Sequence, residues 1–167
     1  MRQMQIQSLP KEYEYLGPAT DFLDDIQEIF CRAPLLEVLD VTETMVLCNF
    51  MACCSVARGV ALLRQGSLND FMLFLLTGRV DLSVRDVTGR KRSLAMLGPG
   101  ASIGEMTMID GSPCGQTSVS VEPVDLVLMT RQGFKDILVT YPRLGNKLLL
   151  VLLHSMSQRL QGGRISG

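Results

Sequence analysis

The chain has 167 residues, about the length of one globular domain, and carries 16 Lys and Arg against 17 Asp and Glu. The resulting formal net charge of -1 excludes a strong overall attraction to nucleic acid or to an anionic membrane. Hydrophobic residues make up 47% and charged residues 20%, which excludes disorder over most of the chain and indicates a packed core.

The hydrophobic content predicts neither a membrane span nor an export signal. The aliphatic run at residues 148–153 is far shorter than the roughly 20 residues that cross a bilayer, and residues 1–5 lack the apolar core of a secretory signal. The five cysteines have no C-x-x-C spacing and the chain has one histidine, so we expect free thiols and no metal site. We therefore expect a cytoplasmic protein without membrane association.

Helical signals dominate the first part of the chain. Residues 1–19 are polar and contain two prolines, which predicts an extended N-terminal arm. Thr20 is placed to cap a first helix that ends near residue 33. Asp40 and Glu43 have the spacing of a capping box, which predicts the start of a second helix.

The middle of the chain has the pattern of a β protein. Short apolar segments between residues 53 and 129 are separated by turns rich in Gly, Asn and Asp, which predicts at least six strands. Residues 71–76 are continuously apolar, as in a strand that is covered on both faces. Residues 79–85 alternate, which predicts that Ser83 faces outward. Short strands with tight turns indicate a β-roll or jelly-roll barrel.

Helical signals return after residue 129. Thr130 is a predicted helix cap, and Pro142 suits the first turn of a final helix that ends near Gly162. The predicted fold is mainly β with flanking helices: a β-roll, or double-stranded β-helix, with N-terminal helices and two C-terminal helices. Its predicted limits are residues 20–161, between the arm (1–19) and a short tail (162–167).

The segment at residues 98–113 interrupts the strands and contains the residues best suited to bind a ligand. Gly104 allows a close approach of the backbone, and the carboxylate of Glu105 is suited to accept hydrogen bonds from ligand hydroxyls. A helical turn from Met106 would direct free amides toward an anion. Amides beside a hydroxyl-binding carboxylate predict a sugar-phosphate site.

The chain resembles the cyclic-nucleotide-binding domains of catabolite-activator-type regulators, protein kinase regulatory subunits and cyclic-nucleotide-gated channels. The resemblance covers about residues 26–161. Its markers, in order, are Gly59, Gly66 and residues 71–80, 98–100, 103–106 and 110–113.

The resemblance implies how such a ligand binds. In the family, a Gly-Glu pair holds the cyclic phosphate through amides and the ribose 2′-hydroxyl through the carboxylate, and a following Arg-(Ser/Thr)-Ala clamps the phosphate. Gly104 and Glu105 match the first element, whereas residues 114–116 (Cys-Gly-Gln) contain no cation. Losing a hydrogen bond to a charged group costs roughly 1.5–3 kcal/mol, a 10- to 150-fold change in affinity. The cations considered as substitutes are Arg90, Lys91, Arg92 and Arg131.

If the pocket takes a ligand, we expect cyclic AMP or another cyclic nucleotide, and no cofactor. The predicted contacts are Ile103, Gly104, Glu105, Met106, Gly115, Gln116 and Thr117. We predict no catalytic residue, because the single histidine, His154, has no Ser, Cys or carboxylate partner nearby in the sequence.

The final helix is the predicted output element. The resemblance implies that it packs across the barrel and against a second subunit through Leu149, Leu152, Met156 and Leu160. We therefore expect a homodimer whose final helix shifts as a lid or lever when ligand binds. No helix-turn-helix sequence follows residue 161, so we expect no direct nucleic-acid binding and an unspecified downstream protein partner.

Two other functions remain open at this point. The chain could be a ligand-independent interaction or dimerisation module that has lost cyclic-nucleotide binding. It could also be a thiol or haem sensor built on Cys114 or His154. An enzyme is disfavoured because the sequence contains no catalytic motif.

Overall fold

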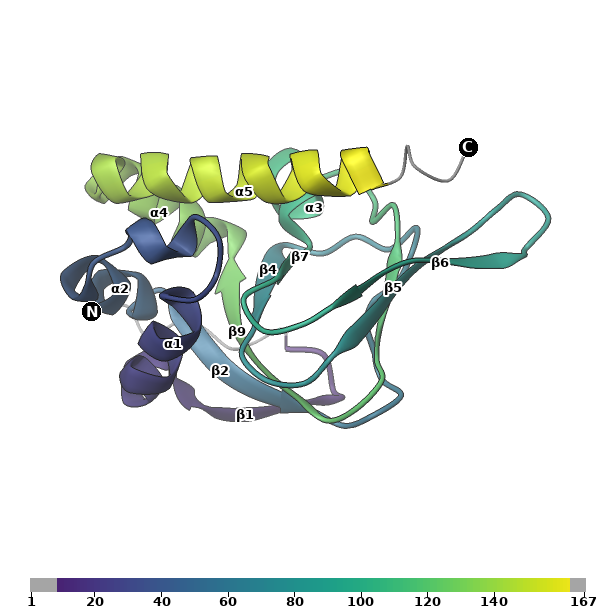
Figure 1. The fold of residues 1–167 in the computed structure, drawn as a ribbon, viewed down its shortest axis with the longest axis horizontal. Helices are drawn as coiled ribbons and strands as arrows, with labels where there is room; N and C mark the ends of the chain where they lie inside the picture. The colour runs from purple at the N-terminus through teal and green to yellow at the C-terminus, as the bar shows by residue number, and fades with distance from the viewer. Residues whose placement is uncertain (1–8, 163–167) are drawn as a thin grey trace.

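The computed structural model describes residues 9–162 (Figure 1). The described chain starts with strand β1 (Tyr13–Pro18), the 3-10 helix η1 (Ala19–Phe22) and helix α1 (Leu23–Phe30). It continues with η2 (Leu36–Val38) and helix α2 (Val41–Cys48). Part of the predicted arm is therefore a strand, since β1 pairs with β2. The expectation that Thr20 caps a helix is wrong: it lies within η1, and neither η1 nor α1 has a side-chain cap.

Two antiparallel sheets form the β-roll that the sequence predicts. The first has the order β1-β2-β9-β4-β7 and contains β2 (Met51–Val56), β9 (Val124–Thr130), β4 (Phe71–Leu75) and β7 (Ser102–Ile103). The second has the order β3-β8-β5-β6 and contains β3 (Ala61–Leu63), β8 (Thr117–Ser120), β5 (Val80–Arg85) and β6 (Lys91–Leu97).

Three further helices complete the fold: α3 (Glu105–Asp110), α4 (Arg131–Thr140) and α5 (Pro142–Gly162). Figure 1 shows that α5 extends along one side of the roll, over α4 at its start and over α3 near its end, while the β5–β6 hairpin projects from the body. This arrangement confirms the predicted fold class. Among residues 9–162, no helix is long and apolar enough to span a membrane.

The core consists of two layers that share the first sheet. Phe74 and Val127 point from this sheet toward the helices, where they pack with residues such as Leu148. The alternate residues Leu73 and Leu126 point into the roll. Because side chains alternate across a strand, both faces of β4 are buried, which confirms the prediction from its continuous apolar sequence.

Ser83 lies on the outer face of β5, as the alternating pattern predicts, but it is not exposed there. Its side chain is buried and lies opposite Thr117 of β8 in the sheet. The side-chain amide of Gln65 bonds both backbone groups of Arg85, accepting from its N–H at 2.7 Å and donating to its carbonyl at 3.1 Å. The outward face of β5 is therefore partly covered at this edge, which the alternating pattern alone does not indicate.

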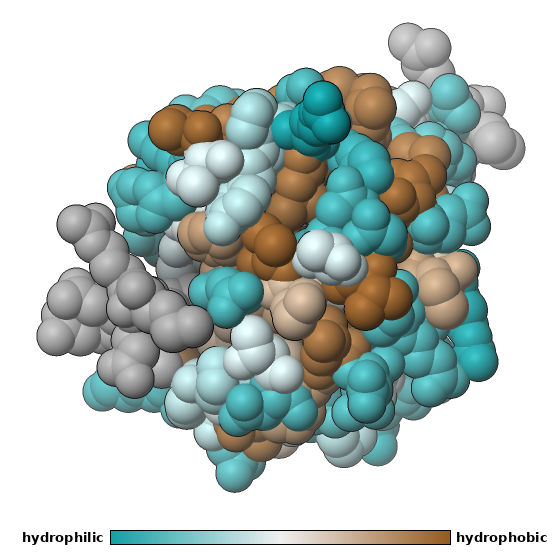
Figure 2. All heavy atoms as spheres, turned by 90° about the vertical axis from the view of Figure 1, so that its left-hand side faces the viewer, coloured by the Kyte–Doolittle hydropathy of each residue, from teal (hydrophilic) through white to brown (hydrophobic). Residues whose placement is uncertain are grey.

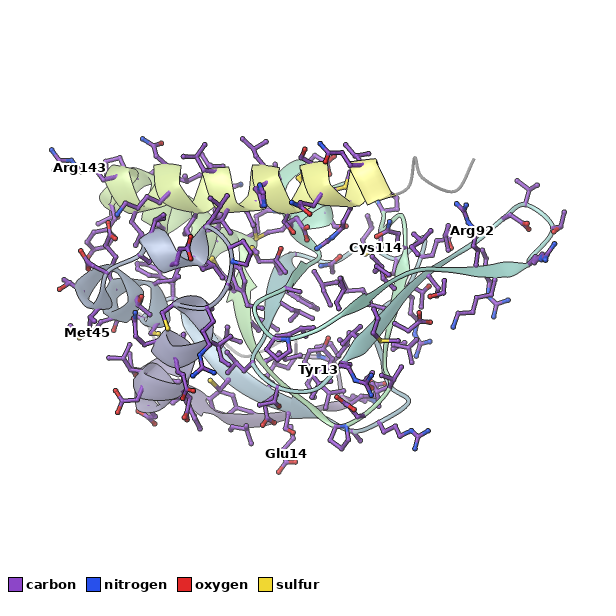
Figure 3. The ribbon with its side chains drawn as sticks, in the orientation of Figure 1. Tyr13, Glu14, Met45, Arg92, Cys114 and Arg143 are labelled. Atoms are coloured by element: carbon purple, nitrogen blue, oxygen red, sulfur yellow. The ribbon has the colours of Figure 1, made fainter. Side chains whose placement is uncertain are left out.

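Figure 2 views the end of the molecule that the helices form, and it shows apolar side chains gathered between polar ones. The exposed apolar residues on α2 and at the α4–α5 corner include Val41, Met45, Val139 and Tyr141. Figure 3 places Met45 at this end, far from the projecting hairpin that carries Arg92.

Candidate functional site

Gly104 joins β7 to α3 in a conformation that favours glycine. Its φ is +86°, and a Cβ atom at this position would lie 2.9 Å from Cδ1 of Leu63 and 3.1 Å from the carbonyl oxygen of Phe71. A larger residue would therefore be strained in its backbone and crowded by β3 and β4. The turn at Gly104 leaves the next side chain, that of Glu105, 1% exposed.

Glu105 is the buried carboxylate of the site. Its Oε1 lies 2.8 Å from Nη1 of Arg159, near the end of α5. This contact is an ion pair, and among residues 9–162 no residue other than Arg159 and Glu105 itself has a polar group placed to contact the carboxylate oxygens. Burial raises the pKa of Glu105, and the opposing effect of Arg159 is smaller. The carboxylate can therefore accept hydrogen bonds from donors that the described chain does not supply.

Arg159 also attaches the end of α5 to β7. Its Nη2 donates to the carbonyl of Ser102 and, at 3.3 Å, to Oγ of Ser155 one helical turn earlier. The hydroxyls of Ser102 and Ser155 lie 3.1 Å apart. The last described turns of α5 are thus held by polar contacts beside Glu105, as the position of α5 over α3 in Figure 1 illustrates.

Cys114 occupies the interior of the segment in which the resemblance places a phosphate-binding cation. Its side chain is buried, and its thiol lies 3.0 Å from Oδ1 of Asn69 and 3.4 Å from Oγ1 of Thr107. Figure 3 shows Cys114 below the far part of α5. A neutral thiol bonded to neutral groups cannot balance a phosphate charge, so this segment offers no compensating cation.

Asn69 is a site residue that the sequence reasoning missed. Its amide nitrogen donates to the carbonyl of Phe71 and lies 3.4 Å from the position that a Cβ of Gly104 would occupy. Asn69 therefore connects Gly104 with the segment that contains Cys114. In the sequence it was visible as part of an Asn-Asp turn signal, which does not reveal these long-range contacts.

The other predicted ligand contacts differ in burial, and the side chain of Thr117 is directed to Gln65. Ile103 is buried in the roll, Met106 is 55% exposed on α3, and Gly115 is exposed. Gln116 is partly exposed. The hydroxyl oxygen of Thr117 accepts the N–H of Gln65 at 3.0 Å.

The side chain of Thr117 lies on the outer face of the second sheet. Thr117 pairs with Ser83, whereas its neighbour Ser118 pairs with Leu82, which belongs to the buried face. Thr117 and Ser83 both line an open groove of about 970 Å³ on this outer face. Because neither Gly104 nor Glu105 lines that groove, it is separate from the carboxylate site.

The four cations considered as substitutes for the missing phosphate-binding arginine either bond to other groups or belong to the projecting hairpin. Nε and Nη2 of Arg131 donate to the carbonyls of Met108 and Thr107 at 2.7 and 2.6 Å, so Arg131 caps the far end of α3. Arg90, Lys91 and Arg92 belong to the exposed projecting hairpin, and Lys91 pairs with Asp81 at 2.8 Å. The structure thus gives none of the four a contact with Glu105, whereas Arg159 has one.

The predicted interface residues of α5 do not share one exposed face. Leu152 is 1% exposed and belongs to the core, so it faces the body of the domain and not a second subunit. Leu149 and Met156 are partly buried, while Leu160 is 72% exposed. Leu150 and Leu153, which the prediction omitted, are 62% and 60% exposed.

Four of the five cysteines are buried in the part of the chain that the structure describes. Burial raises the pKa of Cys48 and Cys53 to about 12 and that of Cys54 to about 11. Within residues 9–162, no group of three His, Cys, Asp or Glu residues is placed to hold a metal ion.

The sequence model of the cyclic nucleotide-binding domain family matches residues 53–141, which is more than half of the chain. The chain belongs to this family. A solved cyclic nucleotide-binding domain from Methylobacillus flagellatus KT is 33% identical, with a TM-score of 0.82 over 90% of this chain and 84% of that one. These matches agree with the resemblance and with the observed fold.

Curated relatives of this cyclic nucleotide-binding domain include regulators of two kinds. The cyclic AMP receptor protein of Thermus thermophilus is 25% identical over 75% of this chain and 58% of its own length. The cAMP-dependent protein kinase regulatory subunit of Eremothecium gossypii is 27% identical over 64% of this chain and 22% of its own length. The chain thus spans less than three fifths of the length of each of these relatives. The chain is a cyclic nucleotide-binding regulatory domain homologous to these receptor proteins and kinase regulatory subunits.

Proposed function

We propose that this domain is a sensor that binds a cyclic nucleotide beside Glu105 and transmits binding through α5. The observation that carries the proposal is the buried carboxylate of Glu105: Arg159 is its one side-chain partner among residues 9–162, so its oxygens can still accept hydrogen bonds from a ligand. Burying a carboxylate away from water costs free energy unless hydrogen bonds compensate for the lost water. The 2′-hydroxyl of a ribose bound beside Glu105 would supply such a hydrogen-bond donor. The backbone amides of Gly104 and Met106, which flank Glu105 in the sequence, are the proposed donors to the phosphate.

The connection to α5 follows from the contacts of Arg159. This side chain contacts both Glu105 and the carbonyl of Ser102, so a sugar hydroxyl that approaches Glu105 must share or displace the guanidinium. A ligand changes a conformational equilibrium by its different affinity for the two states. Occupancy therefore biases the position of the last turns of α5.

We further propose that the output surface is the outer face of α5 and that its partner is a second copy of this chain. Leu150, Leu153 and Leu160 are exposed along this helix, and Met106 and Ile109 are exposed on the neighbouring α3. Apolar side chains on one side of a helix are typical of an isologous dimer interface. A shift of α5 would then change the geometry of the dimer.

Calorimetric titration with cyclic AMP, cyclic GMP and cyclic di-GMP tests the ligand. We expect one of them to bind and Glu105→Gln to weaken it by about 10- to 150-fold, because a hydrogen bond to a charged acceptor is lost. Glu37→Gln, at an exposed carboxylate on η2, is the matched control and should leave the affinity unchanged. Absence of heat with all three ligands at high micromolar concentration would falsify the sensor proposal.

The second candidate is a ligand-independent interaction module. The observation that favours it is the ion pair between Arg159 and Glu105, together with the absence of a cation at residues 114–116. In that case Glu105→Ala leaves partner binding unaffected, whereas a polar residue at Leu153 abolishes self-association.

A further inference from the structure

A phosphate near Glu105 needs a cation that the adjacent segment does not supply. Residues 111–117 contain no Lys or Arg, and the thiol of Cys114 is bonded to Asn69 and Thr107. When Glu105 is ionised, it places one negative charge in the interior, paired with Arg159. A second buried negative charge is strongly unfavourable unless a positive side chain pairs with it. The pocket therefore requires a cation from another element.

Arg131 is the first alternative, and its contacts exclude it. Its guanidinium donates to the carbonyls of Thr107 and Met108 and lies beside Gly111, after the last residue of α3. Glu105 is the first residue of that helix. Reaching Glu105 would leave the C-terminal carbonyls of α3 without their donors, which is costly for buried groups.

Arg159 remains as the cation that already enters the pocket. Its Nη1 lies 2.8 Å from Glu105, while Nη2 is bonded to Ser102 and Ser155. A guanidinium has five N–H donors in a fixed planar arrangement. Among the described residues no hydrogen bond engages Nε, so further donors remain for an acceptor beside Glu105. The side chain is 21% exposed, which leaves it accessible from the rim of the pocket.

We propose that Arg159 is the residue that recognises the phosphate of the ligand, and that phosphate recognition in this domain has moved from the segment at Cys114 to helix α5. This inference rests on the proposed function, since it assumes that a cyclic nucleotide binds beside Glu105. Glu105, Arg159 and the phosphate then carry a net charge of -1, and the guanidinium lies between the two anions. Because Arg159 belongs to α5, its contact with the phosphate also determines the position of the end of this helix.

The test compares cyclic AMP with adenosine, which has the same base and sugar but no phosphate, in calorimetric titrations of the full chain. The wild-type chain should bind cyclic AMP more tightly. Arg159→Gln should weaken the binding of cyclic AMP by about 10- to 150-fold. It should leave the binding of adenosine unchanged or make it tighter, because Arg159 no longer competes with the sugar hydroxyl for Glu105. Arg159→Lys keeps the charge without the planar donors and should retain part of the preference.

Arg143→Gln is the matched control on the same helix. Arg143 is exposed at the opposite end of α5, as Figure 3 shows, and its replacement should change neither affinity. Thermal denaturation checks that each variant is folded. If Arg159→Gln does not fold, the ratio of the two affinities is measured on Arg159→Lys.

Different results overturn the inference and the proposed function. If Arg159→Gln keeps the wild-type ratio of the two affinities, or if the wild-type chain prefers adenosine, Arg159 does not recognise phosphate, although a sugar still binds at Glu105. If the wild-type chain binds neither compound nor any other cyclic nucleotide, the proposed function and the inference both fail.

Discussion

The thiol of Cys114 lies 3.0 Å from Oδ1 of Asn69, and the amide nitrogen of the same Asn69 donates to the carbonyl of Phe71. One side chain thus joins the loop after β3, strand β4 and the segment that leads into β8. Because a Cβ at Gly104 would lie 3.4 Å from the same amide nitrogen, Asn69 lies between Gly104 and the segment that contains Cys114.

Replacing Asn69 with Ala should destabilise the domain by about 1–3 kcal/mol, because the thiol of Cys114 and the carbonyl of Phe71 lose their partner in a partly buried site. Asn49→Ala is the control. The side chain of Asn49 also donates to a backbone carbonyl, that of Met45 at 2.9 Å, but at the exposed end of α2. Urea denaturation measures the free energy of unfolding of both variants. Equal effects of the two substitutions would show that Asn69 has no special structural role.

Gly104→Ala should destabilise the fold by about 1–3 kcal/mol, because φ is +86° and the new Cβ would lie 2.9 Å from Leu63. Gly115→Ala provides the comparison. A Cβ there meets no atom within 4 Å, so that substitution should be neutral or slightly stabilising. The denaturant midpoints of unfolding distinguish the two variants. If Gly104→Ala leaves the midpoint unchanged, the turn is not as crowded as the structure indicates.

The buried carboxylate predicts a pH dependence of stability. Burial raises the pKa of Glu105, so the native state binds this proton more tightly than the unfolded chain. The stability that Glu105 contributes is therefore largest below its ordinary pKa of 4.5 and falls as pH rises through the native value. The unfolding free energy of the wild-type chain minus that of Glu105→Gln should decrease as pH rises above the ordinary pKa of 4.5. An increase over this range would mean that Arg159 outweighs burial.

Thiol labelling should distinguish one cysteine from the other four. Cys31 is exposed, whereas the remaining cysteines are buried. For Cys48 and Cys53 a pKa of about 12 further reduces the thiolate. A chromogenic disulfide reagent should react rapidly with one thiol in the native state and with all five after unfolding. Cys31→Ser should remove the rapid phase. Rapid labelling of Cys114 would instead support a thiol sensor.

Two adjacent leucines on α5 should have different roles. Leu153→Glu, at a side chain that is 60% exposed, should reduce self-association and leave the fold intact. Leu152→Ala should instead destabilise the domain by about 2–5 kcal/mol, because it leaves a cavity in the core. Sedimentation velocity and thermal denaturation separate these effects. A Leu153→Glu variant that associates like the wild type would exclude this face from the dimer.

Local sequence patterns determined much of the fold. The capping box is present, since the N–H of Glu43 donates to Oδ1 of Asp40 at 2.8 Å, and Thr130 caps α4 by accepting from Gly133 at 3.1 Å. The apolar run of β4 correctly predicted burial on both faces. These features depend on residues a few positions apart, so they can be read along the chain.

The orientation of α5 could not be read in the same way. Residues 148–153 are all aliphatic, so helical periodicity cannot choose which leucines face the core. Packing against α4 and the first sheet buries Leu148 and Leu152 and leaves Leu150 and Leu153 exposed. Of the predicted tail, residues 162–167, Gly162 is the last residue of α5, and residues 163–167 lie outside the described structure.

The sequence by itself determined that a β-roll between helices would present Gly104 and Glu105, because a glycine turn and a following carboxylate form a contiguous motif. Only the tertiary structure decided which cation meets that carboxylate. Arg159 lies on the last helix, and a side chain reaches a partner this distant in sequence only when packing sets the position of both elements. The cation that meets Glu105 therefore comes from the other end of the chain rather than from the segment at Cys114.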